Sequence, residues 1–315
     1  MALWLVVVFS FFFISLSVAS PATCLAYDPA NPSTYSYYVT FHADVKNIHH
    51  YSELGQFIGR VFPDSEGVSE LRGMLLFENG NLITANAYKY DSKLFIGSEC
   101  GLATKNTLTN SNLSHPYGLA NGDNPVILSA YPNGTTVVYA TNQDSLVVSY
   151  YVLDDTLSNV VGSGIFGQNS FLKPRGAAVD PITQQLIVAD EDANNVYFLD
   201  FYGNLARDIM VPSPIGTYVS ENILYVSSND DSVPAVYAYN LSNSLVMTNI
   251  YQTPNISDMG HPCGISSCND DLLVLSQDTR SLIVFSKSTA KYRATVINDF
   301  GDDPEQIIAL NCYGY

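Results

Sequence analysis

The stretch KPRGAAVDPITQQLIVADEDANNVYFLDFYGN (residues 173–204) decides the fold class of this chain. Pro-Arg-Gly at residues 174–176 opens an apolar strand, a β-branched strand follows at 185–189, and a third covers 195–200. Turns rich in Pro, Asp and Asn separate the three runs. Short apolar runs punctuated in this way are typical of an antiparallel meander. The stretch therefore predicts a single compact β-sheet unit.

The same order of features resembles an NHL repeat. In that repeat a P-x-G-I-A opening precedes a short turn, an L-x-V-A-D strand and an N-x-V-x-x-F strand. The resemblance implies a propeller blade, and other segments of the chain repeat the pattern. Five openings are centred on Gly73, Gly118, Gly176, Gly216 and Gly264, and their spacings of 45, 58, 40 and 48 residues suit one four-stranded blade each.

The two ends of the chain together supply a sixth blade. Residues 37–41, 47–51 and 57–62 read as second, third and fourth strands with no first strand before them. Residues 303–310 match a blade opening, with Gln306 at the glycine position 42 residues after Gly264. We therefore expect an all-β, six-bladed propeller of four-stranded antiparallel blades over residues 36–315, closed where the C-terminal strand joins the N-terminal blade. The best candidates for fourth strands elsewhere are residues 209–211, 246–251 and 292–297.

The N-terminus predicts export. Residues 2–18 are almost wholly apolar and small residues follow, as in a signal peptide, which we assign to residues 1–22 with cleavage after Ala19 or Ala22. Residues 23–35 then form an N-terminal extension. The leader lacks Lys and Arg, so an uncleaved membrane anchor is the alternative. No other stretch is long and apolar enough to span a bilayer.

Four N-x-S/T sequons agree with a secretory route and a glycoprotein. They lie in segments that read as loops, and their acceptors are Asn112, Asn133, Asn240 and Asn255. Richness in Asn and Ser at turns is the simpler explanation for any one of them. Together with the leader they predict a secreted, extracellular protein.

The charge balance argues against nucleic acid as a partner. The chain carries 13 Lys and Arg residues against 30 Asp and Glu residues, a formal charge of −17. Binding to phosphates needs a basic patch that releases counterions. Some NHL propellers bind RNA through a basic face, and this chain lacks the charge for one.

Strand direction predicts which residues share a face of the ring. In a meander the start of strand one, the end of strand two and the start of strand three lie together. The residues before the opening glycines should line the central mouth; they are Arg72, Tyr117, Arg175, Ile215, Cys263 and, in the sixth blade, Glu305. Turns between strands two and three should add a polar collar, formed by Asp44, Asn86, Asn142, Asp190, Glu191, Asp192, Asp230, Asp231 and Asp278.

Two interpretations of this acidic collar remain open. Loops at one end of a rigid scaffold commonly carry binding groups, which favours a ligand or cation site. Asp and Asn also stabilise tight turns through their own backbone, which requires no ligand. Calcium is the candidate cofactor, held by Asp190 and Asp192 or by Asp230 and Asp231, because a hard cation prefers several oxygen ligands.

Three histidines, His42, His115 and His261, are predicted to lie on the same face. Six-bladed relatives implied by the resemblance include amidating lyases, with histidine-bound zinc, and gluconolactonase-like hydrolases. In the lyases the metal histidine follows the blade-opening proline, whereas Tyr117 and Cys263 hold that place here. Solvent-facing or structural histidines are the alternative to a zinc site.

Nucleophilic catalysis finds little support. The sequence contains no G-x-S-x-G motif. Cys263, two residues from His261 at a strand start, reads more simply as a small buried residue or a disulfide partner.

Five cysteines in an exported chain allow two disulfides and one free thiol. Cys263 and Cys268 stand at opposite ends of one predicted strand, about 16 Å apart, which is too far to bridge. Cys24 and Cys312 flank neighbouring strands on one face and form our leading pair. Cys268 and Cys100 map to that face as well, so other pairings stay open.

Two functions compete on this sequence. The first is a secreted, monomeric, non-enzymatic binding or scaffold propeller that recognises an extracellular protein or glycan through its acidic face. The second is a metal-dependent lyase or hydrolase with its active site at the mouth. A complete scaffold without a complete catalytic set favours the first, since propellers host both kinds of function.

Overall fold

The computed structural model describes residues 35–42, 44–62, 68–88, 90–98, 106–109, 112–157, 159–167, 170–230, 232–242, 244–310 and 312. The predicted signal peptide lies outside these residues, as does the predicted extension except for Tyr35. In the described part of the chain, no helix is long and apolar enough to cross a membrane.

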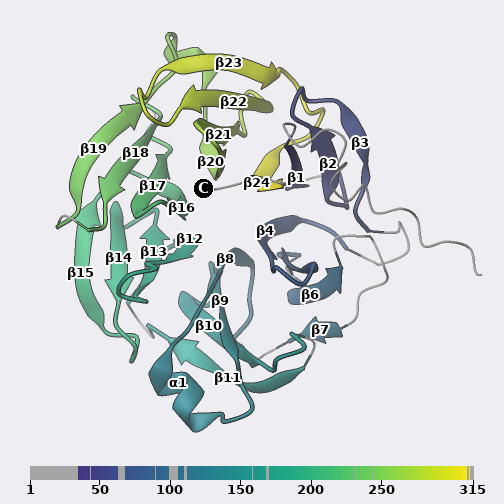
Figure 1. The fold of residues 1–315 in the computed structure, drawn as a ribbon, viewed down its shortest axis with the longest axis vertical. Helices are drawn as coiled ribbons and strands as arrows, with labels where there is room; N and C mark the ends of the chain where they lie inside the picture. The colour runs from purple at the N-terminus through teal and green to yellow at the C-terminus, as the bar shows by residue number, and fades with distance from the viewer. Residues whose placement is uncertain are drawn as a thin grey trace, which may run out of the picture.

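Six four-stranded antiparallel sheets stand around a common axis, which confirms the predicted six-bladed propeller (Figure 1). Blade 1 contains β4 (Leu71–Leu76), β5 (Asn81–Asn86), β6 (Lys93–Ser98) and β7 (Asn106–Leu108). Blade 2 contains β8 (Pro116–Gly122), β9 (Thr136–Asn142), β10 (Val147–Leu153) and β11 (Val160–Phe166). Blade 3 contains β12 (Pro174–Val179), β13 (Leu186–Asp190), β14 (Asn195–Leu199) and β15 (Leu205–Met210).

The remaining blades complete the ring. Blade 4 contains β16 (Pro214–Ser220), β17 (Ile223–Ser228), β18 (Ala235–Asn240) and β19 (Val246–Tyr251). Blade 5 contains β20 (Pro262–Cys268), β21 (Asp271–Ser276), β22 (Ser281–Ser286) and β23 (Tyr292–Ile297). Blade 6 contains β24 (Pro304–Leu310), β1 (Ser36–Phe41), β2 (His49–Ser52) and β3 (Phe57–Arg60). Two short helical segments also occur, α1 (Pro125–Ala130) and a 3-10 turn (Ile256–Asp258).

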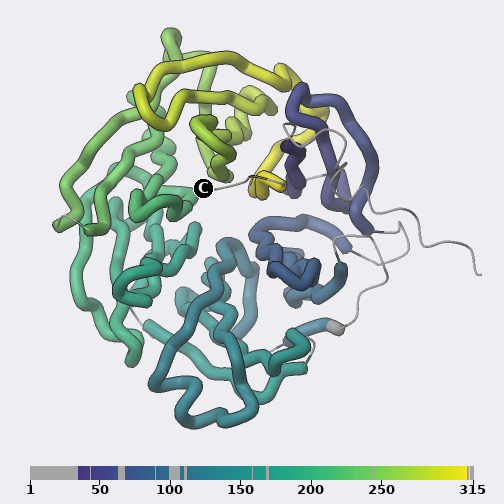
Figure 2. Tube along the Cα trace, in the orientation of Figure 1, coloured from purple at the N-terminus to yellow at the C-terminus, as the bar shows by residue number. Residues whose placement is uncertain are grey.

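Blade 6 closes the ring with strands from both ends of the chain, as expected. β24 pairs antiparallel with β1, and Leu310 lies opposite Ser36 while Ile308 lies opposite Tyr38. Figure 2 shows the yellow C-terminal segment beside the purple N-terminal one. The inner strand of each blade contacts the inner strand of the next all the way round. Closure therefore removes the gap at which a ring of sheets would otherwise open.

Outer strands were the least predictable elements. β19 and β23 coincide with the predicted runs, and β15 begins four residues before the predicted one. β7, β11 and α1 were not predicted at all. The sequence of β11, VVGSGIF, contains two glycines and only its last residue, Phe166, is buried, so it shows neither the apolar alternation nor the apolar run that identifies a strand.

Apolar layers between neighbouring blades form the core. Between blades 3 and 4, for example, Ile187 and Phe198 pack with Leu224 and Val226, and all four are fully buried. The middle strands supply most of these side chains because both of their faces are covered, and every residue of β13 is buried. Burial of each such side chain contributes about 1.5–3 kcal/mol, so the layers hold neighbouring blades together.

The repeated glycines allow the inner strands to approach each other at the axis. A Cβ atom on Gly118 would lie 2.5 Å from the Arg175 carbonyl oxygen, and one on Gly176 would lie 2.6 Å from that of Ile215. Each opening glycine therefore faces the backbone just before the glycine of the next blade. At these five positions a side chain would meet the backbone of the next blade, which accounts for the recurrence of glycine.

Gln306 takes the glycine position in blade 6, as the alignment predicted. The backbone amide of Gln306 donates to Thr40 Oγ1 (3.1 Å), and the Thr40 hydroxyl donates to the Arg72 backbone carbonyl oxygen (2.7 Å). Blade 2 has the same bridge, in which the Gly118 amide donates to Thr141 Oγ1 (2.8 Å) and Thr141 donates to the next blade. The shared bonding shows that Gln306 and Gly118 are equivalent positions.

Replacing Gly118 with alanine is expected to lower the free energy of unfolding by about 2–3 kcal/mol, because the new Cβ meets backbone atoms that cannot move aside. Chemical denaturation would measure the change. Gly59 is the matched control, since a Cβ there meets no atom within 4 Å. Equal effects at the two glycines would show that the axial approach does not limit side-chain size.

Candidate functional site

The residues before the opening glycines gather at one end of the axis, which we call the mouth. In five blades the pairing of the first and second strands shifts register across this position, for instance between Pro174 and Ala177. Such an irregularity re-aims a side chain away from the regular sheet faces. Arg72, Tyr117, Arg175 and Glu305 all contact at least one other member of this ring. Ile215 and Cys263 are buried in the apolar layer beside Tyr117.

A second ring lies around the first and is formed by the residue that follows strand two of each blade. In every blade the backbone amide of this second-ring residue donates a hydrogen bond to a backbone carbonyl oxygen. That oxygen belongs to the residue two positions before the mouth residue of the same blade. The members are His42, Ala87, Gln143, Glu191, Asn229 and Gln277. Because the backbone bond is the same in all six blades, the side chains of this ring are held at equivalent places around the mouth.

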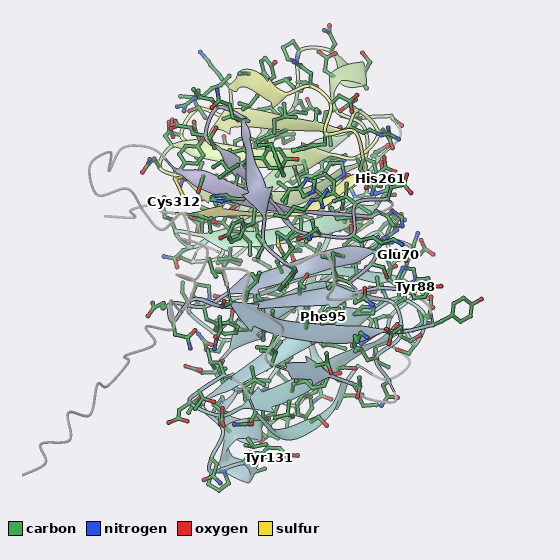
Figure 3. All side chains as sticks on the ribbon, turned by 90° about the vertical axis from the view of Figure 1, so that its right-hand side faces the viewer. Glu70, Tyr88, Phe95, Tyr131, His261 and Cys312 are labelled. Carbon is green, nitrogen blue, oxygen red and sulfur yellow. A yellow bond between two sulfur atoms is a disulfide. The ribbon has the colours of Figure 1, made fainter. Side chains whose placement is uncertain are left out.

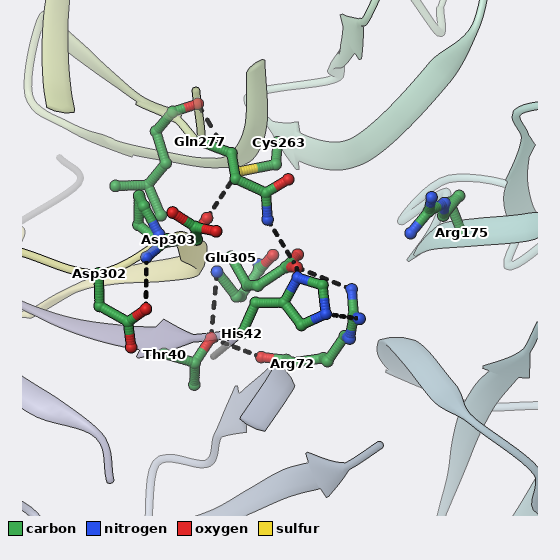
Figure 4. A network of polar contacts seen from close by, with 12 residues as sticks. Thr40, His42, Arg72, Arg175, Cys263, Gln277, Asp302, Asp303 and Glu305 are labelled. Atoms are coloured by element: carbon green, nitrogen blue, oxygen red, sulfur yellow. Dashed lines mark hydrogen bonds and ion pairs between the residues drawn. The ribbon is translucent and has the colours of Figure 1, made fainter. Parts of the chain in front are cut away.

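A buried ion pair occupies the centre of the mouth (Figure 4). Arg72 Nη1 lies 2.7 Å from Glu305 Oε1, and both side chains are about 4% exposed or less. Gln277 of the second ring donates to the same oxygen from 2.9 Å. Burial would raise the pKa of Glu305, but Arg72, His42 and a hydrogen bond from Tyr117 outweigh it and hold the pKa below its ordinary value. Glu305 is therefore an anion paired inside the protein.

Two histidines face Arg72 from either side. Arg72 Nη2 lies 2.7 Å from His42 Nε2 and 3.3 Å from His115 Nε2. Because a guanidinium can only donate, both Nε2 atoms accept and the ring protons sit on Nδ1. Those Nδ1 atoms lie 3.4 Å from carboxylates, His42 beside Glu305 and His115 beside Asp144. The two imidazoles are thus neutral and oriented by charges on both sides.

Arg72 stands where a metal bound by these histidines would have to lie. Within the described residues, no group of three or more His, Cys, Asp or Glu side chains is arranged to hold a metal ion. A zinc ion on His42 and His115 would displace the guanidinium from both Nε2 atoms, and Arg72 would then leave Glu305 without its partner. The arrangement does not favour a zinc site.

A second cluster of charged side chains is centred on the Tyr117 ring. The Arg72 guanidinium lies 5.1 Å from the centre of the Tyr117 ring, and that of Arg175 lies 4.8 Å away. Arg175 Nε donates to Glu191 from 2.6 Å, and Lys173 also reaches Glu191 from 2.8 Å. Burial and the nearby Glu305 raise the pKa of Tyr117 well above its ordinary value, so the phenol stays protonated. Cation–ring contact thus joins the two arginines into one network.

Cys263 lies below this surface and offers no reactive group to solvent. Its side chain is 1% exposed, and its thiol contacts the Pro304 carbonyl oxygen at 3.2 Å. Burial raises the pKa of this thiol well above its ordinary value, with Glu305 adding to the effect. We therefore correct its predicted role at the mouth surface, because its side chain packs into the core beneath Tyr117.

The acidic turns expected to bind calcium have other partners. Asp190 is fully buried, and its two oxygens accept the amides of Leu172 and Lys173, both at 2.8 Å. Asn86 and Asn142 hold equivalent loops in their own blades. Asp190 is therefore a structural anchor for the segment that carries Arg175, and the structure does not support calcium there.

The carboxylates of Asp192 and Asp230, the other predicted calcium ligands that the structure describes, have protein partners as well. Asp192 is exposed and lies 3.8 Å from Lys173, and Asp230 accepts the Ser232 amide from 2.8 Å. Asp231 lies outside the described residues, so calcium at that turn stays a prediction.

Sequence reasoning missed Gln277 and Gln143 as parts of the mouth. With its amide group oriented to suit its neighbours, Gln143 accepts from Arg175 and donates to His115. Both glutamines hold the position directly after strand two, as His42 and Glu191 do. Aligning that position across all blades would have identified them.

One disulfide differs from the leading prediction. Cys312 bonds to Cys268, not to Cys24, with their Cα atoms 5.0 Å apart. The open alternative is realised because β20, which ends at Cys268, lies directly against β24. Cys24 and Cys100 lie outside the described residues.

The predicted glycosylation acceptors differ in their surroundings. Asn133 and Asn255 are exposed, whereas Asn112 and Asn240 are half-buried. Asn240 is the last residue of β18, and its side chain accepts the Ser242 amide, so it does not lie in a free loop as expected. Modification of any of the four stays a prediction.

Acidification from pH 7 to pH 5 is expected to lower the melting temperature by a few degrees. Burial, followed by the charge of Arg72, lowers the pKa of His42 and of His115 below their unfolded value of about 6.5. Below that pH the unfolded chain binds more protons, so stability is lost as the pH falls. Glu305, Glu70, Asp144 and Asp303 face these rings and oppose the shift in part.

The matched test is a His42→Gln, His115→Gln variant, whose amide oxygens can still accept from Arg72. Calorimetry should show a smaller loss of melting temperature in the variant between pH 7 and pH 5. His49 and His50, each with a pKa lowered to about 4 by burial, remain in both proteins and cancel in the comparison. If the variant lost as much melting temperature as the wild type between pH 7 and pH 5, the pH dependence would come from groups outside the mouth.

The fold and the mouth define a six-bladed β-propeller with a closed polar network at one end of its axis. Comparisons with protein-family models and with curated proteins find no match to this chain. Among solved structures, a chain of a nidogen/laminin complex aligns with a TM-score of 0.67 and 11% identity, covering 88% of this chain and 98% of that one.

Two further structures show the same fold. A Bacteroides caccae protein of unknown function aligns with a TM-score of 0.63 and 12% identity, covering 88% of this chain and 99% of that one. Virginiamycin B lyase from Staphylococcus aureus aligns with a TM-score of 0.61 and 13% identity, covering 88% of each chain. At these identities the likeness shows the propeller fold, which both binding proteins and lyases use.

Proposed function

We propose that this chain is an extracellular, non-enzymatic binding propeller that recognises a protein or a glycan through its mouth face, with a basic protein as the favoured partner. The observation that carries the proposal is the closed network at the mouth. Arg72 and Glu305 are buried and bond to each other, and both contact the partly exposed His42, so the three side chains form a rigid surface in which each of them is already paired. The Cys268–Cys312 disulfide supports an oxidising compartment.

The charge around the mouth favours a basic partner. Exposed acidic side chains surround it in several blades; these are Asp44, Asp144, Asp192 and Asp278. Acidic groups repel a sulfated or otherwise anionic glycan and attract a surface rich in Lys and Arg. Exposed Tyr88 and Tyr90, whose rings are 5.8 Å apart, lie at the same face and offer apolar contact area.

The experiment uses the secreted protein as bait against extracellular proteins, followed by kinetic measurement with each purified partner. An Asp144→Asn, Asp192→Asn, Asp278→Asn variant should slow association several-fold at low salt, and the difference should shrink as salt screens the charges. A control variant removes three exposed acids from the opposite face, Glu78→Gln, Asp123→Asn and Asp155→Asn. Equal effects of the two variants would reject the mouth face, and binding only to neutral glycans would reject a basic protein.

A metal-dependent lyase or hydrolase is the second candidate. The observation behind it is the likeness of the fold to that of virginiamycin B lyase. A metal on His42 and His115 would require Arg72 to move out of the space between them. Under this hypothesis the purified protein contains stoichiometric zinc or another divalent metal, and a chelator lowers its stability. Elemental analysis that finds no metal, with no effect of the chelator, would count against this candidate and leave the binding proposal intact.

A further inference from the structure

A cavity of about 400 Å³ opens at the end of the axis opposite the mouth, and we call it the lower pocket. It is lined by the second halves of all six inner strands, whereas the mouth residues stand at the beginnings of these strands. Figure 3 shows the two faces, with Cys312 at one edge of the ring and His261 and Glu70 at the other. Cys312 lines the pocket, so the disulfide to Cys268 fixes one part of its wall.

The lower pocket is blind. Toward the mouth the axis narrows to a gap of about 10 Å³, where Gly118, Gly176 and Gly216 bring the inner strands together. Tyr117 and Glu305 line the same gap. As the described residues define the cavity, a ligand of the size that 400 Å³ accommodates would enter from the open face and not through this gap.

The residues that line the lower pocket favour an uncharged ligand over a charged one. Among the residues that the structure describes, no charged side chain lines the pocket, although the chain has a formal charge of −17. Met74, Leu76, Val179, Val219 and Ile265 supply apolar surface. The inner strands pair on one side only, so their free backbone edges face the axis and offer hydrogen-bonding groups. An uncharged molecule with an apolar body and a few polar groups matches these walls.

Thr217 provides a polar group at the blind end. Its side chain is 8% exposed and lines both the lower pocket and the gap. Its buried hydroxyl has no hydrogen-bond partner within the described part of the chain. Nearby hydroxyls are satisfied, since Ser266 Oγ accepts the Ala309 amide and Ser267 Oγ bonds Tyr218. Buried polar groups normally have partners, so an unpartnered hydroxyl at the end of a cavity points to a ligand.

We propose that the lower pocket binds an uncharged, largely apolar small molecule whose hydroxyl, amine or amide group hydrogen-bonds to Thr217. This site is independent of the mouth face and of its partner. The proposal rests on the cavity, its uncharged lining and the unpartnered hydroxyl.

N-Phenyl-1-naphthylamine, a neutral dye with one N–H donor, is the probe. Its fluorescence should rise and saturate at one site per chain when it is titrated into the full-length protein. The anionic analogue 1-anilinonaphthalene-8-sulfonate carries the same rings and should bind at least about 10-fold more weakly, because the pocket has no cation to pair with its sulfonate. Equal affinity for the two dyes would overturn the proposal.

Two variants locate the dye. Thr217→Val keeps the shape and removes the hydroxyl, and it should weaken the neutral dye about 3- to 10-fold. Thr248→Val on the outer strand β19 is the control and should leave the affinity unchanged. Val219→Glu places a charge on the pocket wall and should abolish binding, with circular dichroism confirming that the variant folds.

Besides equal affinity for the two dyes, three results would overturn the proposal. The first is unchanged affinity in Thr217→Val. The second is the same loss of affinity in the Thr248→Val control. The third is dye entry only after deletion of residues 313–315, which would mean that the chain itself fills the lower pocket.

Discussion

Replacing Arg72 with methionine is expected to lower the free energy of unfolding by about 3–5 kcal/mol, the largest effect of any single side chain at the mouth. Methionine preserves most of the apolar stem but leaves the Glu305 carboxylate buried without its cation. It also removes the donor to His42 and His115, so the geometry of the second ring loosens. Urea denaturation at pH 7 would measure the loss.

A double variant separates the charge effect from packing. Combining Arg72→Met with Glu305→Met removes both buried charges, and the pair should recover most of the stability lost by the single change. The control is Arg280→Met, because Arg280 is about half exposed, pairs with Asp303 at 2.9 Å and should cost less than about 1 kcal/mol. Similar losses of unfolding free energy in the Arg72 and Arg280 variants would mean that the Arg72–Glu305 pair is as well hydrated as an exposed surface pair.

Removal of the Cys268–Cys312 disulfide is expected to cost about 4 kcal/mol, by the chain-entropy relation for a loop of 44 residues. The bond ties the end of β20 in blade 5 to the segment after β24 in blade 6. Without it the unfolded chain gains freedom, and the strand that closes the ring loses its anchor. A Cys268→Ala, Cys312→Ala variant under oxidising conditions provides the measurement.

Reductant supplies the control for this prediction. Reduction acts equally on any other disulfide in the two proteins, so the difference between wild type and variant should largely disappear in reductant. Peptide mapping of the oxidised protein should recover Cys268 joined to Cys312. Recovery of Cys312 joined to Cys24 would contradict the structure and restore the pairing that strand order alone favoured.

The blade count and ring closure follow from local sequence signals. An opening glycine recurs every 40–58 residues in five of the six blades, because neighbouring inner strands approach closely at that point. The unmatched strands at 37–62 and the opening at 303–310 complete each other for the same reason. Short continuous apolar runs identify the middle strands, which are buried on both faces, as in LIVAD of β13. The outer strands β7 and β11 carry a weaker signal, because β7 has only three residues and β11 is mostly half-buried or exposed.

The sequence by itself determined the propeller, its closure and the face on which the mouth residues stand, because these depend on repeated short-range patterns. Only the tertiary structure decided what those residues do to one another. Arg72 and Glu305 are 233 positions apart, and nothing local indicates that they form a buried pair. Nor does any local pattern indicate that Arg72 lies between the imidazole rings of His42 and His115.

The same limit applies to the cysteines, to Asp190 and to the lower pocket. Strand order placed several cysteines on one face, and the contact between β20 and β24 selected Cys268. Asp190 reads as a cation ligand in sequence and proves to anchor backbone amides. The lower pocket exists only where six strands from the whole chain meet, since side chains that are distant in sequence define its walls.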